Sequence, residues 1–574
     1  MYRPTLDPVG NSLGLSSIFA ALPLLTLFIL LGVVRVRAWL AALISLAVAL
    51  LVAMVIYSMP VGQALLAGTE GAAFGLFPIM WIVINAVWIY NMTVVTGHFD
   101  LLRQSFAKVS DDMRVQAVII AFCFGALLEA LAGFGTPVAV TSVMLIALGF
   151  RPIKAATLAL VANTAPVAYG ALATPITTLA TVTALPFGHL GAMVGRQTPI
   201  LAIFVPLVLV FIVDRGRGLR EVWPAALICG VAFGIAQFVT SNYISVPLAD
   251  IVASLVSAGA VVAYQAVRPS AHWVEPLEEA EEVAQRSVAG QASGGGTRSG
   301  GPSADARTAG GVRTDVPAAT GGAGGTPGSG DVVRAYAPYL IIIVVFVFAQ
   351  IAAVKSLLDS VTIKFAWPGL HLQTASGKPS TLPTFNFNWL LATGTLMLIA
   401  GLITIPAIRI PVGQAVRAYG RTLEQLATAI ATVMLVLALA YVMNSSGQTA
   451  TLGNWMAAAG GLFALISPLL GWLGVAVTGS DTSSNSLFGA LQVSAATKAG
   501  LDPLLMAASN SSGGVLGKMI SPQNLAIACA AVGMARREGD LVRKVFVWSL
   551  VLVAFMCALV YLQSTPVLSW MVVG

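Results

Sequence analysis

The segment Asn163-Thr-Ala-Pro-Val-Ala-Tyr-Gly-Ala-Leu-Ala-Thr-Pro175 recurs, in altered form, as Asn510-Ser-Ser-Gly-Gly-Val-Leu-Gly-Lys-Met-Ile-Ser-Pro522. The asparagine, the glycine and the proline keep the same mutual spacing in both copies. Glycine and proline interrupt helices, and each copy lies within an apolar part of the chain. Paired interruptions in corresponding positions of two halves point to the binding site of a secondary transporter. The pattern therefore predicts a membrane carrier made of two related halves.

Composition supports a membrane protein. Of the 574 residues 57% are hydrophobic and 9% are charged, and the mean hydropathy is +0.89. A soluble protein would carry roughly a quarter charged residues. The net charge of +7 comes from Lys and Arg scattered over short loops, which does not indicate a nucleic-acid surface. We therefore expect an all-α polytopic membrane protein that binds no nucleic acid. The four cysteines form no metal-binding spacing, and we expect no metal and no cofactor.

Twelve apolar runs have the length of a membrane span. They cover residues 15–33, 38–57, 72–95, 155–186, 190–213, 222–244, 246–267, 335–355, 387–408, 424–443, 503–535 and 544–564. Two more apolar stretches, 115–150 and 455–500, are interrupted by Gly133-Phe-Gly-Thr-Pro137 and Gly479-Ser-Asp-Thr-Ser483. Arms such as 137–150 are shorter than the about 20 residues of a full crossing. We therefore expect about twelve transmembrane helices, re-entrant hairpins at 115–150 and 455–500, and broken helices at 155–186 and 503–535.

The basic loops set the expected orientation. With twelve crossings and two hairpins, all the Lys/Arg clusters lie on one side of the membrane, which the positive-inside rule makes cytoplasmic. Both termini are then outside, and the two halves form an inverted repeat. Counting each hairpin as two full crossings leaves these assignments unchanged, so fourteen spans stay possible. The clusters are Arg35/Arg37, Arg103/Lys108/Arg114, Arg151/Lys154, Arg215/Arg217/Arg220, Arg409/Arg417/Arg421 and Arg536/Arg537/Arg543/Lys544.

A polar segment separates the halves 1–267 and 335–574. Residues 268–334 begin with an acidic run and continue as Gly/Ser/Ala/Thr-rich sequence. Such a composition does not bury enough apolar surface to offset chain entropy. We expect a disordered cytoplasmic linker, although a regulatory role is also open.

Neutral polar residues around the breaks are candidates for substrate binding. A broken helix frees backbone groups, which a water-filled cavity or a ligand must satisfy. The N-termini of half-helices carry partial positive charge and suit a carboxylate. Hydrogen bonding between packed helices is the alternative role for these side chains. The candidates are Gly133, Thr136, Asn163, Thr164, Tyr169, Thr482, Asn510, Ser511 and Ser512.

Three ionisable residues lie inside the interrupted segments. A charge at the centre of a bilayer is costly unless it is paired or hydrated, so Glu129, Asp481 and Lys518 are functional candidates. Glu129 and Asp481 are candidate proton carriers, because a site of low dielectric favours the protonated carboxyl. Lys518 is a candidate for holding a substrate carboxylate. A fixed ion pair of Lys518 with either acid is the structural alternative.

At these residues the chain resembles the bacterial L-lactate permease family. The resembling stretches are Leu128-Glu-Ala-Leu-Ala-Gly-Phe-Gly-Thr-Pro137, Asn163-Thr-Ala-Pro-Val-Ala-Tyr-Gly170, Thr478-Gly-Ser-Asp-Thr-Ser-Ser-Asn485 and Asn510 to Asn524. The resemblance implies proton-coupled uptake of L-lactate, with D-lactate and glycolate as further substrates. A weaker resemblance to a wider ion-transporter superfamily implies an elevator-type mechanism, in which a hairpin-bearing domain moves against a scaffold.

These observations together predict a symporter for a small monocarboxylate and a proton in the inner (plasma) membrane. The hairpins with residues 155–213 and 503–564 would form the moving domain, and the remaining spans would form the scaffold and a homodimer contact. A sodium-coupled carrier of dicarboxylates is the alternative, because carbonyls at broken helices can bind sodium. An enzyme would need a nucleophile and a base, and a sensor would need a folded output domain; the sequence shows neither.

Overall fold

The computed structural model describes residues 1–574 except 108, 134, 271–272, 274–328, 375–376, 378, 381–382 and 535–536. Lys108, Arg536 and most of the predicted linker 268–334 therefore lie outside the described residues. Residues 329–334 of that predicted linker form the start of a helix. Helices dominate the described part of the chain, where the strands form one antiparallel pair.

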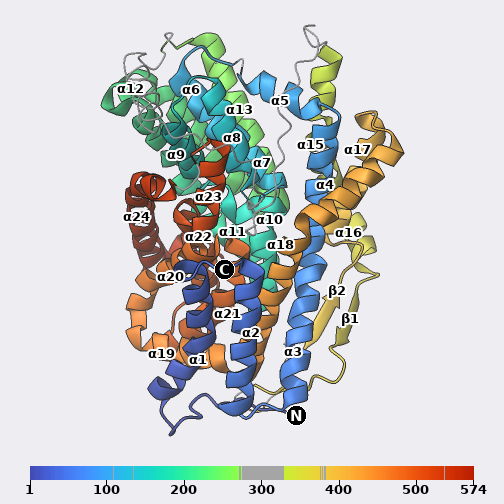
Figure 1. Cartoon of the computed structure of the whole chain (residues 1–574), viewed down its shortest axis with the longest axis vertical. Helices are drawn as coiled ribbons and strands as arrows, with labels where there is room; N and C mark the ends of the chain where they lie inside the picture. Colours follow the sequence, from blue (N-terminus) through green and yellow to red (C-terminus); the bar gives the residue numbers. More distant parts are fainter. Residues whose placement is uncertain are drawn as a thin grey trace, which may run out of the picture.

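The helices of the first half run from the N-terminus to residue 267 (Figure 1). They are α1 (Leu13–Phe28), α2 (Ala38–Val55), α3 (Val61–Phe74), α4 (Trp81–Val95), α5 (His98–Ala107), α6 (Met113–Ala117), α7 (Gly125–Leu131), α8 (Thr136–Ala147), α9 (Pro152–Ala162), α10 (Gly170–Thr183), α11 (Phe187–Val194), α12 (Thr198–Val239) and α13 (Ala249–Val267). Short π or 3-10 turns join several of them, among them η3 (Val118–Phe124) between α6 and α7, and η4 (Val167–Tyr169) before α10.

The second half extends from residue 329 to the C-terminus. Its elements are α15 (Ser329–Gln350), α16 (Ala352–Asp359), β1 (Ile363–Ala366), β2 (Thr384–Phe387), α17 (Thr393–Ala407), α18 (Val412–Ser446), α19 (Gln448–Met456), α20 (Phe463–Thr478), α21 (Asp481–Ala499), α22 (Pro503–Gly517), α23 (Pro522–Ala531) and α24 (Glu538–Gln563). A 3-10 turn, η8 (Lys518–Ile520), separates α22 from α23. The strands β1 and β2 pair with Ile363 opposite Phe387.

Ten helical segments of the described chain are long and apolar enough to cross a membrane, or eleven if a bent pair counts as one span. The expected number was about twelve, and part of the difference comes from the stretch Phe187–Ile244, which counts as one segment although it contains two helices. These two helices meet at a kink, where Asp214 and Arg215 have non-helical backbone angles, so the predicted spans 190–213 and 222–244 lie on either side of it. The predicted span 387–408 contains only the shorter helix α17.

The predicted interruptions are visible as breaks in the helices. The axes of Pro152–Ala162 and Val167–Thr183 differ by 65°. After the break, Ala171, Leu172 and Ala173 have left-handed backbone angles, so regular α10 geometry resumes near Thr174. In the first predicted hairpin, Met113–Leu131 is long enough to span a membrane by itself, whereas the second arm, Thr136–Ala147, is shorter.

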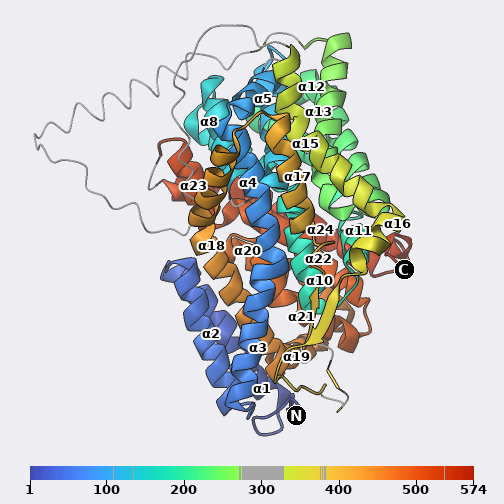
Figure 2. The ribbon, with the colours of Figure 1, turned by 90° about the vertical axis from the view of Figure 1, so that its right-hand side faces the viewer.

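One group of helices forms an extended support, which we call the scaffold. It contains α1 to α4, α15, α17 and α18, and the long helices α3, α4 and α18 run along the length of the molecule (Figure 2). Glycines allow α3 to approach α18 closely: Gly71 faces the carbonyl of Leu437, and a Cβ at Gly75 would lie 2.7 Å from Cα of Met434. Small residues at such contacts are typical of helix packing in membranes.

The other group, which we call the core domain, contains the interrupted segments. It consists of α6 to α13 and α20 to α24, and most of its buried apolar residues belong to one large hydrophobic cluster that also includes residues of α4, α15, α17 and α18. Helices α20 and α22 touch through glycines, with Gly513 against the carbonyl of Pro468 and Gly517 against that of Trp472. Because the backbones are in contact, the breaks of the second half are held in a fixed relation to each other.

Candidate functional site

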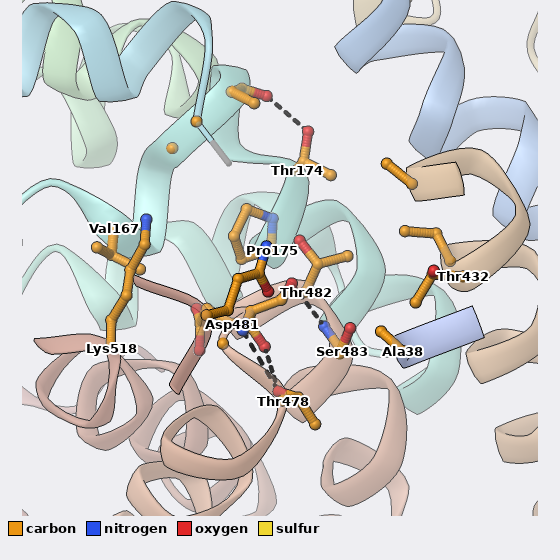
Figure 3. Close-up of a pocket in the computed structure, with 18 of the residues that line it drawn as sticks. Ala38, Val167, Thr174, Pro175, Thr432, Thr478, Asp481, Thr482, Ser483 and Lys518 are labelled. Atoms are coloured by element: carbon orange, nitrogen blue, oxygen red, sulfur yellow. Dashed lines mark hydrogen bonds between the residues drawn. The ribbon is translucent and has the colours of Figure 1, made fainter. Parts of the chain in front are cut away.

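A cavity of about 80 Å³ lies between the core domain and the scaffold (Figure 3). A single water occupies about 10–15 Å³ of such volume, so the space fits a small solute. Its walls come from both halves of the chain. The lining residues are Ala38, Glu129, Gly133, Val167, Gly170, Ala171, Thr174, Pro175, Ala429, Thr432, Val433, Thr478, Gly479, Ser480, Asp481, Thr482, Ser483, Lys518 and Gln523.

Two helix starts face the cavity. Ser480 caps α21, and its hydroxyl accepts a hydrogen bond of 3.3 Å from the backbone N–H of Ser483. The resumed part of α10 begins at Thr174 and Pro175, which also line the cavity. Unpaired N–H groups and the helix dipole make such starts favourable for an anion. The cavity therefore combines a small volume with two helix starts, a geometry that favours an anion.

A buried ion pair crosses one side of the cavity. Lys518 Nζ lies 2.6 Å from Glu129 Oε1, and the two side chains are 7% and 4% exposed. The amide of Asn163 donates to the other oxygen, Glu129 Oε2, over 2.9 Å. A Cβ at Gly170 would lie 2.7 Å from Glu129 Oε1, so the absence of a side chain there leaves room for the carboxylate. Of the two pairings left open by the sequence, Lys518 forms the one with Glu129.

Asp481 has a different environment in the first turn of α21. Its Oδ2 accepts hydrogen bonds from Ser511 over 2.5 Å and from Asn485 over 3.4 Å. Its Oδ1 is buried and has no hydrogen-bond partner among the residues that the structure describes. Gly514 packs against this oxygen. Asp481 thus keeps one carboxyl oxygen available for a proton at the edge of the cavity.

Five of the predicted site residues line the cavity: Gly133, Thr482, Glu129, Asp481 and Lys518. The other seven are buried without being part of its lining. They are Thr136, Asn163, Thr164, Tyr169, Asn510, Ser511 and Ser512.

The buried polar candidates support the lining residues or neighbouring backbone. Asn163 holds Glu129 and Ser511 holds Asp481, as described above. Thr164 donates to the carbonyl of Val161, and Tyr169 donates to that of Gly191 over 2.7 Å. These hydrogen bonds support the residues and the backbone around the cavity.

The second-half asparagine, Asn510, is part of a hydrogen-bond network that reaches Asp481 through Asn485. Asn510 donates to Asn485 over 2.9 Å and accepts from Gln492 over 3.1 Å. Ser512 Oγ is buried and finds no partner within the described part of the chain. These contacts cross-link α21 and α22 behind the cavity.

Several lining residues were not among the predicted candidates. Thr174 and Gln523 adjoin the repeated prolines, and Ser480 and Ser483 flank Asp481, so the same pattern could have found them. Thr432 lies in the scaffold helix α18, where no sequence signal marks it. Buried acids outside the interrupted segments were also missed, among them Glu70 and Asp250. Glu70 lies just before the predicted span 72–95, and Asp250 lies near the start of the predicted span 246–267.

Nothing in the described structure resembles a metal centre. No group of three or more His, Cys, Asp or Glu residues that could hold a metal ion occurs in the described residues. The four cysteines are buried and unbridged, and Cys123 and Cys229 have their sulfur atoms 3.4 Å apart.

Comparison with known proteins identifies the family. The family model described as L-lactate permease matches residues 16–567. The chain is 40% identical to the glycolate permease GlcA of Escherichia coli K12, with 97% of each chain covered, and 39% identical to the L-lactate permease of the same strain, with 100% covered. The structure of MtrF from Neisseria gonorrhoeae is similar with a TM-score of 0.47 and 12% identity, covering 94% of this chain and 97% of that one. Permeases are transporters and not enzymes. Given the match over nearly its whole length, this multi-pass membrane protein belongs to the L-lactate permease family.

Proposed function

We propose that this protein takes up L-lactate, and also D-lactate and glycolate, across the plasma membrane together with a proton. The names of its relatives support the substrate class. The observation that carries the proton coupling is the position of Asp481. Its carboxyl lies in the first turn of α21, at the same cavity wall where the helix end favours an anion.

The substrate carboxylate would lie between the starts of α21 and the resumed α10. Hydroxyl groups of Thr174, Thr482 and Ser483 line this region and can bind the carboxylate and the hydroxyl of a hydroxy acid. Figure 3 shows Asp481 beside Pro175 and Thr482, with Lys518 farther to the left. Lys518 adds positive charge, although part of that charge is already neutralised by Glu129. One such lysine suits a monoanion better than a dianion.

Proton and substrate would favour each other through electrostatics. An anion at the start of α21 is repelled by an ionised Asp481, and protonation of Asp481 removes this repulsion. By linkage, the bound anion favours the proton by the same factor. Both carboxyl oxygens of Glu129 already have partners, Lys518 and Asn163, whereas Asp481 has one oxygen without a hydrogen-bond partner in the described residues. Asp481 is therefore the primary proton site in our proposal, and Glu129 is a secondary one.

The position of the cavity supports movement of the core domain along the scaffold. Ala38 of α2 and Thr432 of α18 form its scaffold wall, whereas the substrate-binding groups belong to the core domain. A sliding core domain would carry the site and leave Ala38 and Thr432 behind. The proposal also keeps the arrangement predicted from the sequence: the two halves form an inverted repeat, and each contains one re-entrant hairpin. The linker 268–334 is cytoplasmic, both termini are outside, and the scaffold forms the contact of a homodimer.

Uptake into liposomes tests the function. The purified protein is reconstituted, and labelled L-lactate, D-lactate, glycolate and a C4 dicarboxylate are offered under separately imposed proton and sodium gradients. The proposal expects accumulation of the three monocarboxylates with acid outside, independent of sodium. Accumulation driven by sodium at constant pH, or preferential uptake of the dicarboxylate, would overturn it and favour the sodium-coupled alternative.

A further inference from the structure

One face of helix α18 forms part of the scaffold wall of the cavity. Ala429, Thr432 and Val433 line the cavity, and residues three and four positions apart share one side of a helix. We call these three residues the α18 face. Val433 is buried and belongs to the same hydrophobic cluster as Ala171, which lines the cavity from the broken helix α10. Figure 3 shows Thr432 to the right of Thr482. Apart from Thr432, the polar lining residues belong to the core domain, so the α18 face brings an apolar surface to the cavity.

The α18 face is a poor partner for the carboxylate of a substrate. Carboxylates bind to hydrogen-bond donors and to cations. The alanine and valine side chains have no donor, and Thr432 donates its hydroxyl proton to the carbonyl of Thr428 over 2.7 Å. These residues lie inside the fully described helix Val412–Ser446, where backbone N–H groups are bonded within the helix. The helix starts of the core domain suit the carboxylate better, which leaves the carbon end of the molecule for the α18 face.

Backbone contacts fix the position of the α18 face. The turn η2 (Gly75–Met80) packs against α18. A Cβ at Gly75 would lie 2.7 Å from Cα of Met434 and 3.3 Å from the carbonyl oxygen of Val433, so the approach requires a residue without a side chain. Contact between backbones leaves α18 little freedom to shift when a larger ligand enters the cavity. The α18 face is therefore a wall of fixed position.

The small volume of the cavity makes the length of a ligand important. At about 10–15 Å³ for one water, a cavity of about 80 Å³ holds roughly five to eight water-sized groups. Glycolate, L-lactate and L-2-hydroxybutyrate share the carboxylate and the neighbouring hydroxyl. They differ in the substituent at the hydroxyl-bearing carbon, which is hydrogen, methyl and ethyl respectively. Each added carbon therefore takes up a substantial part of the available space.

We propose that the α18 face selects substrates by size, with Ala429 and Val433 in contact with the carbon substituent of a bound 2-hydroxy acid. This inference rests on the proposed function and deepens it, because the core domain holds the carboxylate and the hydroxyl while the scaffold limits the substituent. The contact belongs to the arrangement seen here, in which α21 of the core domain packs against α18. The hydrogen of glycolate leaves the face unfilled, the methyl group of lactate packs on it, and the ethyl group of 2-hydroxybutyrate is crowded.

Two substitutions change this wall in opposite directions. Val433→Ala removes both methyl groups of the valine and makes room for a longer substituent, whereas Ala429→Val adds a branched side chain and takes room away. One methylene in a hydrophobic pocket changes specificity by about 10- to 200-fold. Because the α18 face is only one side of the cavity, we expect the Kd of 2-hydroxybutyrate divided by that of lactate to change by about three- to tenfold. This ratio should fall in Val433→Ala and rise in Ala429→Val.

Isothermal titration calorimetry of the purified protein in detergent measures these ratios. The ligands are L-2-hydroxybutyrate, L-lactate and glycolate, all at the same acidic pH. Val436→Ala is the matched control for Val433→Ala, because Val436 is a buried valine of α18 that does not line the cavity. Ala427→Val is the control for Ala429→Val, since Ala427 is an exposed residue of the same helix outside the lining. Both controls should keep the ratios of the wild type.

Opposite shifts in the two variants would support the proposal, because a general loss of stability does not reorder ligands in two directions. Unchanged ratios, shifts in the same direction, or equal shifts in the controls would overturn it. If Val433→Ala does not fold, Ala429→Val decides alone, and a wild-type ratio in that variant would overturn the proposal. Failure of acid-driven lactate accumulation by the wild type in liposomes would instead overturn the proposed function, while the binding ratios would still decide the role of the α18 face.

Discussion

Lys518 Nζ and Glu129 Oε1 lie 2.6 Å apart and join the interrupted segments of the two halves of the chain. Glu129 lies in α7, before the first Gly/Thr interruption, and Lys518 begins η8, between the two parts of the second broken helix. The pair is almost fully buried, and Asn163 binds the remaining oxygen of Glu129. Three of the polar residues that the repeat brought to attention thus form one unit at the wall of the cavity.

Removing one member of this pair should destabilise the protein more than removing both charges. Breaking a buried ion pair from one side costs about 3–5 kcal/mol, because it leaves a buried charge without compensation. Glu129→Gln and Lys518→Met should each lower the melting temperature of the purified protein in detergent, and the double variant should recover most of the loss. Additive effects of the two substitutions would show that the pair is not coupled.

Asp481→Asn should separate substrate movement from proton movement. The asparagine keeps the size of the side chain and its contacts with Ser511 and Asn485, but it carries no titratable proton. Lactate exchange at equal pH should continue, while accumulation driven by an acid-outside gradient should fall at least about tenfold. The comparison uses one liposome preparation for both assays. Acid-driven accumulation at the wild-type level would remove Asp481 from the proton path.

The repeated glycines and prolines made the main features of the site predictable. They marked the two breaks, and mid-membrane charges near them are few, so Glu129, Asp481 and Lys518 could be identified directly. The sequence could not decide whether Lys518 pairs with Glu129 or with Asp481, because all three residues lie near breaks in the apolar segments. Tertiary packing decides it: Asp481 is bound by Ser511 of α22, and Glu129 is the acid that reaches Lys518.

Other parts of the structure have no local signal. Ala38 and Thr432 are ordinary residues of apolar helices, and only the arrangement of scaffold and core domain brings them to the cavity. Glu70 was missed because it precedes the predicted span 72–95 and therefore did not count as a charge within the membrane.

Gly170→Ala should disturb the ion pair without removing any polar group. The added methyl carbon would lie 2.7 Å from Glu129 Oε1 and 3.3 Å from its Cγ, so the glutamate must shift away from Lys518. We expect lactate uptake to fall several-fold. Gly188→Ala is the matched control, because a Cβ at Gly188 meets nothing within 4 Å. Equal loss in both variants would show that the effect is a general cost of replacing glycine.

Arg37 should assist the capture of the substrate anion. It is exposed and immediately precedes Ala38, which lines the cavity, and a second exposed arginine, Arg35, lies beside it in the same turn. Positive charge near the mouth of a cleft raises the local concentration of anions, and salt screens this effect over about 8 Å at physiological ionic strength. Since these arginines are predicted to be cytoplasmic, Arg37→Ala should raise the KM for lactate entering from that side about two- to threefold at low ionic strength and leave the maximal rate unchanged.

The salt dependence distinguishes this electrostatic role from a structural one. The increase in KM caused by Arg37→Ala should disappear at high salt, because the wild-type advantage is screened there. Lys544→Ala, which removes an exposed cation from α24, serves as the control and should leave the KM unchanged at both ionic strengths. Initial rates of lactate efflux through the cytoplasmic face, measured in liposomes over a range of internal concentrations at two salt levels, give both parameters. A lower maximal rate that persists at high salt would instead assign Arg37 to the packing of the turn between α1 and α2, since screening does not alter such contacts.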